Sequence, residues 1–251
     1  MHTHTLPLSE DSELTPSEMI VLAKRAGLDA ICLTEHDAFR SDDEIAALCR
    51  RHDFTVIPGV EINTENEHLI VFGLKRWVVG MSRADMVKQL VDEAHGALLI
   101  AHPYRRKVLR AGDPDGLRYR RELDRACDNP LFRGADAIEV FNARANDREN
   151  AFSRELAARL NIRGFAGSDA HEPTAVGRAA TYFERSVSNA AELIAELKEG
   201  RFRALSQVEV GDCLHPITAS RNSKRGDIDF WGVERVNGTD PPSAGPAPDR
   251  P

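Results

Sequence analysis

Histidine and carboxylate side chains recur in six short segments of this 251-residue chain, at spacings that suit metal ligands. The segments are HTH at 2–4, EHD at 35–37, GVE at 59–61, AHP at 101–103, IEVFN at 138–142 and GSDAH at 167–171. In an extended segment alternate residues point to the same side, so His2 and His4 can approach one ion, as can Asp169 and His171. Each motif alone is weak, but their joint occurrence predicts a metal site.

The ligand-type residues stand where apolar runs end. His36 and His102 each follow such a run, and in parallel α/β folds the carboxyl ends of the strands carry the site. Glu61 and Glu139 lie inside apolar segments, where a carboxylate is rare unless it is paired or bound to a metal. A buried salt bridge would need arginine or lysine in those strands, and the sequence places none there. Metal ligation is therefore the favoured interpretation.

The type and number of these residues indicate which ions would bind. Mixed imidazole and carboxylate ligands suit Mn, Zn or Fe, whereas a set made only of carboxylates would suit Mg or Ca. One four-coordinate ion cannot use eight or more ligands, so we expect two or three divalent ions. Such a cluster would generate hydroxide from a bridging water near neutral pH and hold both oxygens of an in-line displacement. Phosphoryl transfer benefits most from that arrangement, because its charge spreads over several oxygens.

Short apolar runs alternate with segments of helical periodicity along the chain. Strands are expected at 29–33, 54–62, 68–74, 97–101, 135–141 and 163–166. Helices are expected at 16–26, from 41, at 83–94, from 146 or 147 to 160, and from 188 to the stop at Gly200. Ser41, Ser82 and Ser188 are the expected starts of three of them, and Thr15 with Glu18 forms a capping box for the first. This alternation predicts an α/β fold with a parallel sheet, open or closed into a barrel.

The composition of the chain limits the cellular location and the binding partners that we expect for this protein. The formal net charge of −7 argues against a nucleic-acid-binding surface over the whole molecule, so no stable binding of duplex nucleic acid is expected. Four scattered cysteines without a CxxC pair indicate reduced thiols and a cytoplasmic protein. No signal peptide precedes the first motif, and no apolar run approaches the roughly 18 residues of a membrane span. We expect one domain at 1–210, a C-terminal extension at 211–236 and a proline-rich disordered tail at 237–251.

The six motifs, taken in order, resemble those of the PHP (polymerase and histidinol phosphatase) superfamily over roughly residues 1–210. The resemblance implies a distorted seven-stranded β/α barrel with a three-metal cluster at the carboxyl ends of the strands. It implies a first ion held by His2, His4, Glu61 and Asp169, a second by Glu61 and His102 with Glu139 as a further candidate, and a third by His36 and His171. The implied activity is hydrolysis of a small phosphorylated metabolite, nucleotide or short oligonucleotide.

The loop at 6–12 and His68 are compared separately with the family pattern. Many small members carry an SDG turn after HxHT, whereas this chain has a loop at 6–12 that is about two residues longer and lacks glycine. Asp11 is the expected ligand of the third ion from this loop, with Glu10 as its rival and a solvated loop carboxylate as the alternative. His68 resembles a position that the family places beside the substrate, so it is a candidate catalytic acid or supporting residue.

A phosphate substrate needs cationic partners besides metal, and arginine suits bidentate phosphate contacts. Arg105 and Arg106 follow the AHP motif, and Arg178 lies near the last metal motif. These three are the predicted substrate-binding residues. Arg144 follows IEVFN and is predicted to act in catalysis beside His68. The segment 104–129, rich in arginine and aspartate, is long enough to form a lid or a substrate-selecting insertion.

Two other functions fit the same motifs. A metal-dependent amidohydrolase also uses HxH on a barrel, but that class typically needs a carboxylated lysine, and no lysine stands at a strand end here. A non-catalytic regulatory domain that binds metal is the third possibility, although the nearly full ligand set speaks against it. An HxH pair should end a first strand, yet only Met1 precedes it. Either the chain starts unusually late or the N-terminus lacks a few strand residues.

Overall fold

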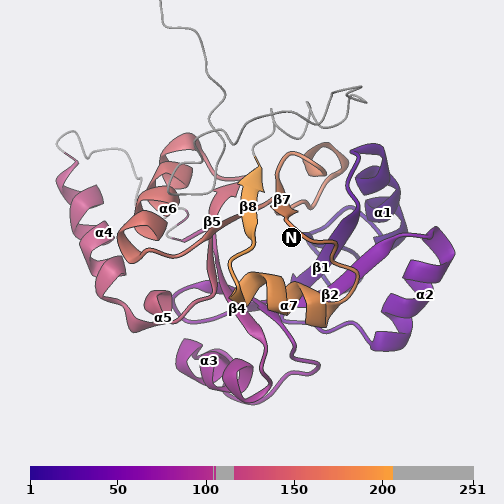
Figure 1. Ribbon diagram of the computed structural model, residues 1–251, viewed down its shortest axis with the longest axis horizontal. Coiled ribbons are helices and arrows are strands. Elements are labelled where there is room, and N and C mark those ends of the chain that lie inside the picture. The colour runs from indigo at the N-terminus through magenta and orange to yellow at the C-terminus, as the bar shows by residue number, and fades with distance from the viewer. Residues whose placement is uncertain (104, 106–115, 206–251) are drawn as a thin grey trace, which may run out of the picture.

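The computed structural model of the chain describes residues 1–103, 105 and 116–205. Arg106, the predicted C-terminal extension and the predicted tail lie outside the described residues. The described residues form an α/β fold whose main sheet has six strands in the order β1-β2-β3-β4-β5-β6. Helices surround this curled sheet, with α1 and α2 on one side and α4 and α6 on the other (Figure 1). Over the described part, none of the helices combines the length and apolar character needed to cross a membrane.

The strands of the main sheet are β1 (Ala30–His36), β2 (Thr55–Asn63), β3 (His68–Phe72), β4 (Ala97–Ala101), β5 (Ala137–Asn142) and β6 (Gly164–Gly167). The helices are α1 (Pro16–Arg25), α2 (Asp42–His52), α3 (Ala84–Glu93), α4 (Leu117–Asp128), α5 (Pro130–Arg133), α6 (Asp147–Leu160) and α7 (Ala190–Lys198), with a 3₁₀ turn η1 (Pro173–Ala175). A separate antiparallel pair consists of β7 (Ala180–Phe183) and β8 (Phe202–Leu205). The six strands predicted from the sequence therefore exist, with ends that differ by a few residues.

The expected parallel pairing is correct for three strand pairs of the main sheet and wrong for the two pairs that involve β3. Strands β1 and β2, β4 and β5, and β5 and β6 pair in parallel, but β3 is antiparallel to both of its neighbours. The reason is the short connection between Asn63 and His68, since a parallel pair needs a crossover of a dozen or more residues. Asn63 therefore pairs directly with His68 in a hairpin. The reversal brings the start of β3, not its end, to the edge where β2 ends.

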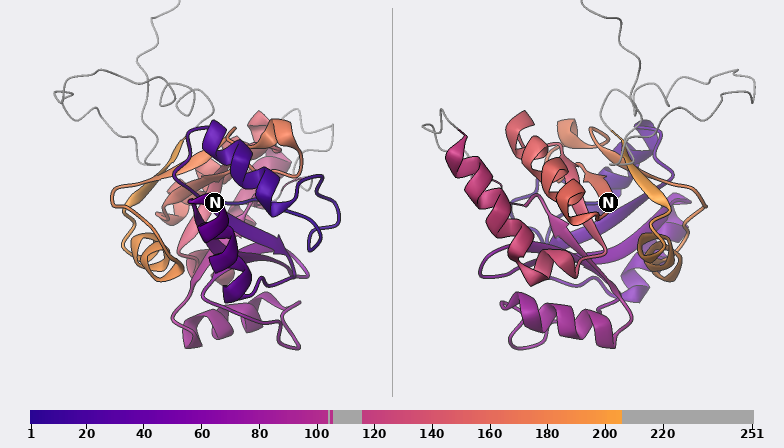
Figure 2. Two further views of the ribbon diagram at one scale, coloured as in Figure 1. Left: turned by 90° about the vertical axis from the view of Figure 1, so that its right-hand side faces the viewer. Right: turned by 60° about the vertical axis from the view of Figure 1, so that its left-hand side comes forward.

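Alternate residues of each strand point to opposite faces of the sheet, and both faces are buried in apolar clusters. Leu69 and Val71 pack with the side chains of α3 to α6, whereas Ile70 and Phe72 point inward and contact α7 through Leu193. Figure 1 shows α7 across the front of the sheet, and Figure 2 shows α4 alongside α6 on the outside. The inner face is thus apolar over most of its length and is covered by α7 at one end.

The N-terminal segment lies between the two outer strands of the curled sheet. The Thr34 N–H donates to the Thr3 carbonyl at 3.0 Å, and the His4 N–H donates to the Ala170 carbonyl at 3.1 Å. Thr3 and Ala170 form an isolated parallel bridge, so residues 2–4 connect β1 to the segment after β6. A single bridge is not a strand, and the predicted seven-stranded barrel is not confirmed. The observed sheet has six strands.

Helix starts agree with the sequence in three cases and differ in two. Thr15 and Glu18 form the predicted capping box of α1, Ser41 caps α2, and Asn146 caps α6. The predicted cap Ser82 is wrong, because Arg83 occupies that position and provides no side-chain hydrogen bond. The cap of α7 is Asn189, not Ser188, although Ser188 bonds to Glu192 one turn later.

The predicted insertion at 104–129 contains helix α4 in its described part. The buried residues Leu123 and Ala126 place α4 in the same apolar cluster as Phe152 of α6. This part of the segment therefore belongs to the packed outer layer of the fold. Tyr104 and residues 106–115 lie outside the described residues.

Candidate metal centre

The predicted ligands gather at one edge of the sheet because they continue the inward-facing sides of their strands. Glu61 stands two residues after Gly59 and four after the inward-facing Ile57 on β2. Glu139 follows Ala137 of β5 by the same period, and both side chains are fully buried. The apolar inner face therefore changes to a polar one at the carboxyl ends of these strands.

One oxygen of Glu61 is the point on which three imidazoles converge. Glu61 Oε2 lies 3.3 Å from His2 Nε2, 3.2 Å from His4 Nε2 and 3.0 Å from His36 Nδ1. These four atoms are buried and have no hydrogen-bond partner of suitable geometry among the described residues. Buried polar atoms are normally satisfied, so such a group of four needs an explanation, and a divalent cation among them supplies one. The donor set, imidazole nitrogen with carboxylate oxygen, fits Mn, Zn or Fe.

The other oxygen of Glu61 faces two more histidines. Glu61 Oε1 lies 3.0 Å from His68 Nδ1 and 3.1 Å from His102 Nε2. These three residues form one of the groups whose ligand atoms are close enough to hold an ion. His68 reaches the group because β3 is antiparallel, which places it beside Ala101 and hence next to His102. His68, predicted from the sequence as a catalytic acid or supporting residue, thus occupies a position that also suits a metal ligand.

Asp169 lies beside the same histidines. Its Oδ1 is 3.4 Å from His4 Nε2 and 3.6 Å from His2 Nε2, and its Oδ2 is 4.0 Å from His102 Nε2. His2, His102 and Asp169 form a further group with metal-like spacing, as do His2, His4 and Glu61. The structure therefore brings together all members of the first predicted ligand set.

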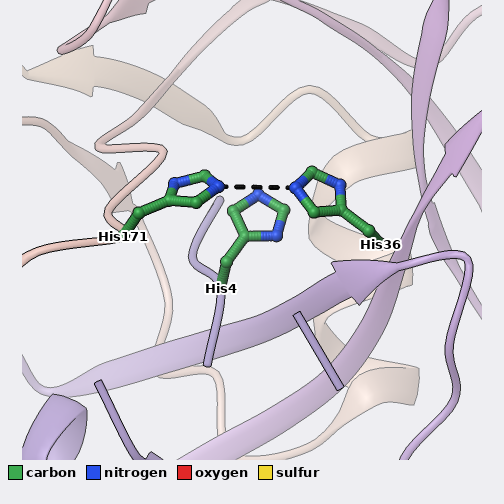
Figure 3. Close-up of side chains that lie close together, drawn as sticks. All are labelled: His4, His36 and His171. Atoms are coloured by element: carbon green, nitrogen blue, oxygen red, sulfur yellow. Dashed lines mark hydrogen bonds between the residues drawn. The ribbon is translucent and has the colours of Figure 1, made fainter. Parts of the chain in front are cut away.

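A third group surrounds His4 on its other side. Figure 3 shows His4 between His36 and His171, whose Nε2 atoms are 3.4 Å apart. Asp11 Oδ2 lies 3.1 Å from His171 Nε2 and 3.4 Å from His36 Nε2. Asp11, and not its neighbour Glu10, is thus the loop carboxylate that approaches this group. Its side chain is 58% exposed, so this side of the centre is the more open one.

Two residues of the centre, His102 and Asp169, and Asp37 next to His36 have left-handed backbone conformations. Asp37, His102 and Asp169 have φ values of 51°, 25° and 50°, and each follows the end of a strand. Such conformations cost about 1–3 kcal/mol each in residues other than glycine, and they cluster at functional sites. Here they turn the chain at the ends of β1 and β4 and after β6, where side chains must point across the sheet edge.

The buried carboxylates and histidines of the centre shift one another's pKa values. Burial alone would raise the pKa of Glu61, but His2, His102 and His36 outweigh it and hold that pKa well below 4.5. Burial opposes and His2 and His4 favour the charged form of Asp169, so its pKa also lies well below its ordinary value. Burial would lower the pKa of His2, but carboxylates including Glu139 and Glu61 raise it well above 6.5. The centre therefore favours charged carboxylates.

The pKa values of His36 and His171 shift in opposite directions, although both residues belong to the group around His4. The pKa of His36 is raised, because Glu61 and Asp11 outweigh the opposing effect of burial. The pKa of His171 is lowered by burial and by the neighbouring His4. A neutral imidazole is the form that binds a metal, so His171 is the member of this pair that needs least change to become a ligand.

The predicted arginines do not all reach the centre. Arg105 contacts Asp169 Oδ2, and Arg144 Nη1 lies 2.8 Å from His171 Nδ1 and 3.9 Å from Asp169 Oδ1. Arg178 is exposed and follows Gly177, whose backbone packs against Ala26 at the end of α1. Arg105 and Arg144 thus border the centre.

Several supporting residues escaped prediction. Ser9 donates to Glu35 Oε2 at 2.7 Å, accepts the His36 N–H at 3.2 Å and lies 3.4 Å from His4 Nδ1. Asn142 Nδ2 donates to Glu139 at 3.0 Å and to Asp169 at 3.3 Å. Asn142 closes the IEVFN motif, and its inclusion in that motif was the available signal. Ser9 had no such signal, because its role depends on how the loop at 6–12 folds back.

Two family models match this chain. Residues 1–123 match the PHP domain, and residues 147–202 match a PHP-associated model. An uncharacterized protein of Methanocaldococcus jannaschii is 29% identical over 139 residues, which is 55% of this chain and 71% of that protein.

Two solved structures are similar in fold. A provisionally assigned metal-dependent phosphoesterase from Bifidobacterium adolescentis aligns with a TM-score of 0.54 at 14% identity, over 78% of this chain and 94% of its own. An amidohydrolase from Chromobacterium violaceum, with bound sulfate and no metal, aligns with a TM-score of 0.51 at 20% identity, over 82% and 96%. At these identities the likeness establishes the α/β fold alone. The two family matches span every predicted ligand between them except Glu139, and they show that the chain belongs to the PHP domain family.

Proposed function

We propose that this chain is a metal-dependent hydrolase of phosphate esters, served by two or three Mn, Zn or Fe ions. The observation that carries the proposal is the convergence of His2 Nε2, His4 Nε2 and His36 Nδ1 on Glu61 Oε2, all four buried without a hydrogen-bond partner among the described residues. When bound, such ions supply an activated water near neutral pH and offset negative charge on a phosphoryl group.

The geometry suggests how the ligands would divide among the ions. His2, His4, Glu61 and Asp169 would hold the first. Glu61, His68 and His102 would hold the second, which gives His68 the role of a ligand in place of a catalytic acid. Asp11, His36 and His171 would hold the third. The last group is the least enclosed, because Asp11 is mostly exposed, so it would lose its ion first.

The arginines at the border favour a phosphate substrate. Arg105 and Arg144 each lie beside Asp169, where a substrate anion would meet the cluster. Guanidinium groups can bind two phosphate oxygens at once and keep their charge at all relevant pH values. Arg144 would orient the phosphoryl group and stabilise its developing charge, and Arg105 would hold its other oxygens. The substrate would be a small phosphorylated metabolite, a nucleotide or a short oligonucleotide, in a cytoplasmic protein whose described cysteines are free thiols.

A metal-dependent amidohydrolase is the second candidate, favoured by the fold shared with the protein from Chromobacterium violaceum. Enzymes of that class commonly use a carboxylated lysine as a metal ligand. The four described lysines have partners elsewhere: Lys24 bonds to the His52 carbonyl, and Lys75, Lys88 and Lys198 pair with Asp42, Asp92 and Asp136. Within the described residues this feature therefore supports the phosphoesterase. A non-catalytic metal-binding domain is the third candidate.

Metal analysis beside a substrate screen tests these proposals. The full-length chain would be purified, loaded with Mn²⁺, Zn²⁺ or Fe²⁺, and assayed with p-nitrophenyl phosphate, nucleotide phosphates, short oligonucleotides and a panel of cyclic amides. We expect two or three bound ions and turnover of phosphate esters alone. Turnover of amides alone would establish the amidohydrolase. Bound metal without turnover of any substrate would favour the regulatory domain and refute the enzyme.

A further inference from the structure

Glu139 is buried within β5, and both of its oxygens already have partners in the protein. Its Oε1 lies 3.1 Å from His2 Nδ1. Its Oε2 accepts the His102 backbone N–H at 2.8 Å and the Asn142 Nδ2 at 3.0 Å. Three donors therefore surround one carboxylate, and Glu139 is absent from all the groups of described residues whose ligand atoms could hold an ion.

His2 stands between Glu139 and the proposed metal ligands. Its Nδ1 faces Glu139, and its Nε2 lies 3.3 Å from Glu61 Oε2 and 3.6 Å from Asp169 Oδ1. A carboxylate can only accept from Nδ1, which places the proton there in the neutral ring and leaves the lone pair on Nε2. That lone pair points at the two carboxylates with which His2 would share an ion. Glu139 thus fixes both the ring orientation and the tautomer.

Gly167 supplies an independent indication that this pair is built into the fold. A Cβ at this position would lie 2.5 Å from His2 Cβ and closer still to Glu139 Oε1. Any side chain would push the imidazole and the carboxylate apart. Gly167 does not have a positive φ, so the reason for glycine is the close approach of the pair and not a special turn.

We propose that Glu139 is a positioning residue that acts on the metal centre through His2, and that it is not itself a ligand. This inference rests on the proposed metal site and replaces the sequence prediction of Glu139 as a ligand of the second ion. Outer partners that orient a metal-binding histidine typically change metal affinity about 10–100-fold when removed. An effect of that size is therefore expected from Glu139→Ala.

A double-mutant cycle separates the two roles. Zn²⁺ affinity would be measured by competition with a chromophoric chelator in the wild-type chain, Glu139→Ala, His2→Ala and the double variant. If Glu139 acts through His2, Glu139→Ala weakens binding about 10–100-fold in the wild-type background and causes no further loss in the His2→Ala background. Equal losses in both backgrounds would make Glu139 a ligand. No loss in either would remove it from the centre.

A spectroscopic readout keeps the inference testable if His2→Ala binds no Zn²⁺. In the Zn²⁺-loaded protein with ¹⁵N-labelled histidine, His2 should carry a solvent-protected Nδ1 proton and no Nε2 proton. Glu139→Ala should lose the protected Nδ1 resonance, and Glu139→Gln should disturb it, because an amide cannot accept on both sides. An unchanged His2 resonance in both variants would overturn the proposal.

Glu196→Ala provides the matched control, since Glu196 is a buried carboxylate of α7 whose partner is Arg201. It should lose stability but keep its Zn²⁺ affinity and its His2 resonance. Neither readout depends on turnover. A wild-type chain that binds Zn²⁺ but hydrolyses no phosphate ester would refute the proposed function and leave the role of Glu139 standing. A wild-type chain that binds neither Zn²⁺ nor Mn²⁺ would overturn both.

Discussion

The backbone N–H of Asp169 donates to the carbonyl oxygen of His2 at 2.9 Å. This hydrogen bond holds the last motif of the ligand set against the first, although nearly the whole described fold lies between them in sequence. It also keeps the Asp169 side chain near His2 without any contribution from the carboxylate itself. The position of Asp169 and the charge of Asp169 can therefore be tested separately.

Asp169→Asn should abolish function while leaving the fold intact. The amide keeps the size of the side chain and the backbone bond to His2, but it removes the negative charge that a cation needs. We expect the loss of at least one bound ion and a fall in phosphate ester hydrolysis of more than about 100-fold, beyond the usual effect of an outer partner. Metal analysis, a p-nitrophenyl phosphate assay and far-UV circular dichroism would check this. Full activity in this variant or in His2→Ala would refute the ligand assignment.

Arg144→Gln and Arg105→Gln should each weaken use of the substrate. A hydrogen bond to a charged group contributes about 1.5–3 kcal/mol, which corresponds to a loss in kcat/KM of roughly 10–150-fold. Steady-state kinetics with a phosphate ester would measure it, and bound metal should stay unchanged. Arg159→Gln is the control, because Arg159 pairs with Asp124 and Glu155 on the surface. A loss as large in the control would show that the effect is not specific.

The ligand motifs could be predicted because they depend on local order along single strands. A strand whose residues are apolar until a His or Glu near its end indicates a site at that end. Strand β2 with Glu61 is an example. The capping box of α1 and the predicted start of α6 at Asn146 are equally local. Even the choice of Asp11 over Glu10 agrees with the structure, in which Asp11 approaches His36 and His171.

The remaining features depend on pairing between distant segments. The direction of β3 decides that His68 reaches Glu61, and no pattern within 68–72 specifies that direction. The contacts of the Glu139 carboxylate with His2 and His102, and the close approach of His2 and Glu139 at Gly167, depend on segments that lie far apart in the sequence. The strands β7 and β8 have four residues each, too few for a period of two to stand out. The sequence therefore predicts which residues gather at the centre, but not the contacts that arise from packing between distant segments.

Arg40→Met should destabilise the chain strongly without touching a proposed ligand. Arg40 Nε donates at 2.8 Å to Glu35, a fully buried carboxylate that also accepts from Thr5 and Ser9. Removal of one partner leaves a buried charge unpaired and costs about 3–5 kcal/mol. Urea denaturation of the full chain would measure the loss. The double variant Glu35→Gln, Arg40→Met should recover part of it, and a loss below about 1 kcal/mol would show that water or another cation already compensates Glu35.

The stability of the metal-free protein should fall on both sides of a window between about pH 4.5 and pH 6.5, the ordinary pKa values of Glu and His. The pKa of Glu61 is lowered in the folded state, so its contribution is complete above 4.5 and is lost as the pH falls through the folded value. Asp169 acts in the same direction. The pKa of His2 is raised, so its contribution is complete below 6.5 and is lost as the pH rises through the folded value.

Saturating metal should remove the alkaline limb of this profile, because a metal-bound histidine has already lost its proton and the cation replaces it beside the carboxylates. Thermal denaturation of the full chain from pH 3 to pH 9, with chelator or with excess Zn²⁺, would test this. In chelator His2→Gln should be less stable than the wild type near pH 6 and should lack most of the alkaline decline, with His36 supplying the rest, since its pKa is also raised. A metal-free wild type whose stability is flat from pH 6.5 to pH 9 would contradict the charge balance assigned to His2. In that case the imidazole would be neutral beside the carboxylates, and protons would not compete with the metal for the centre.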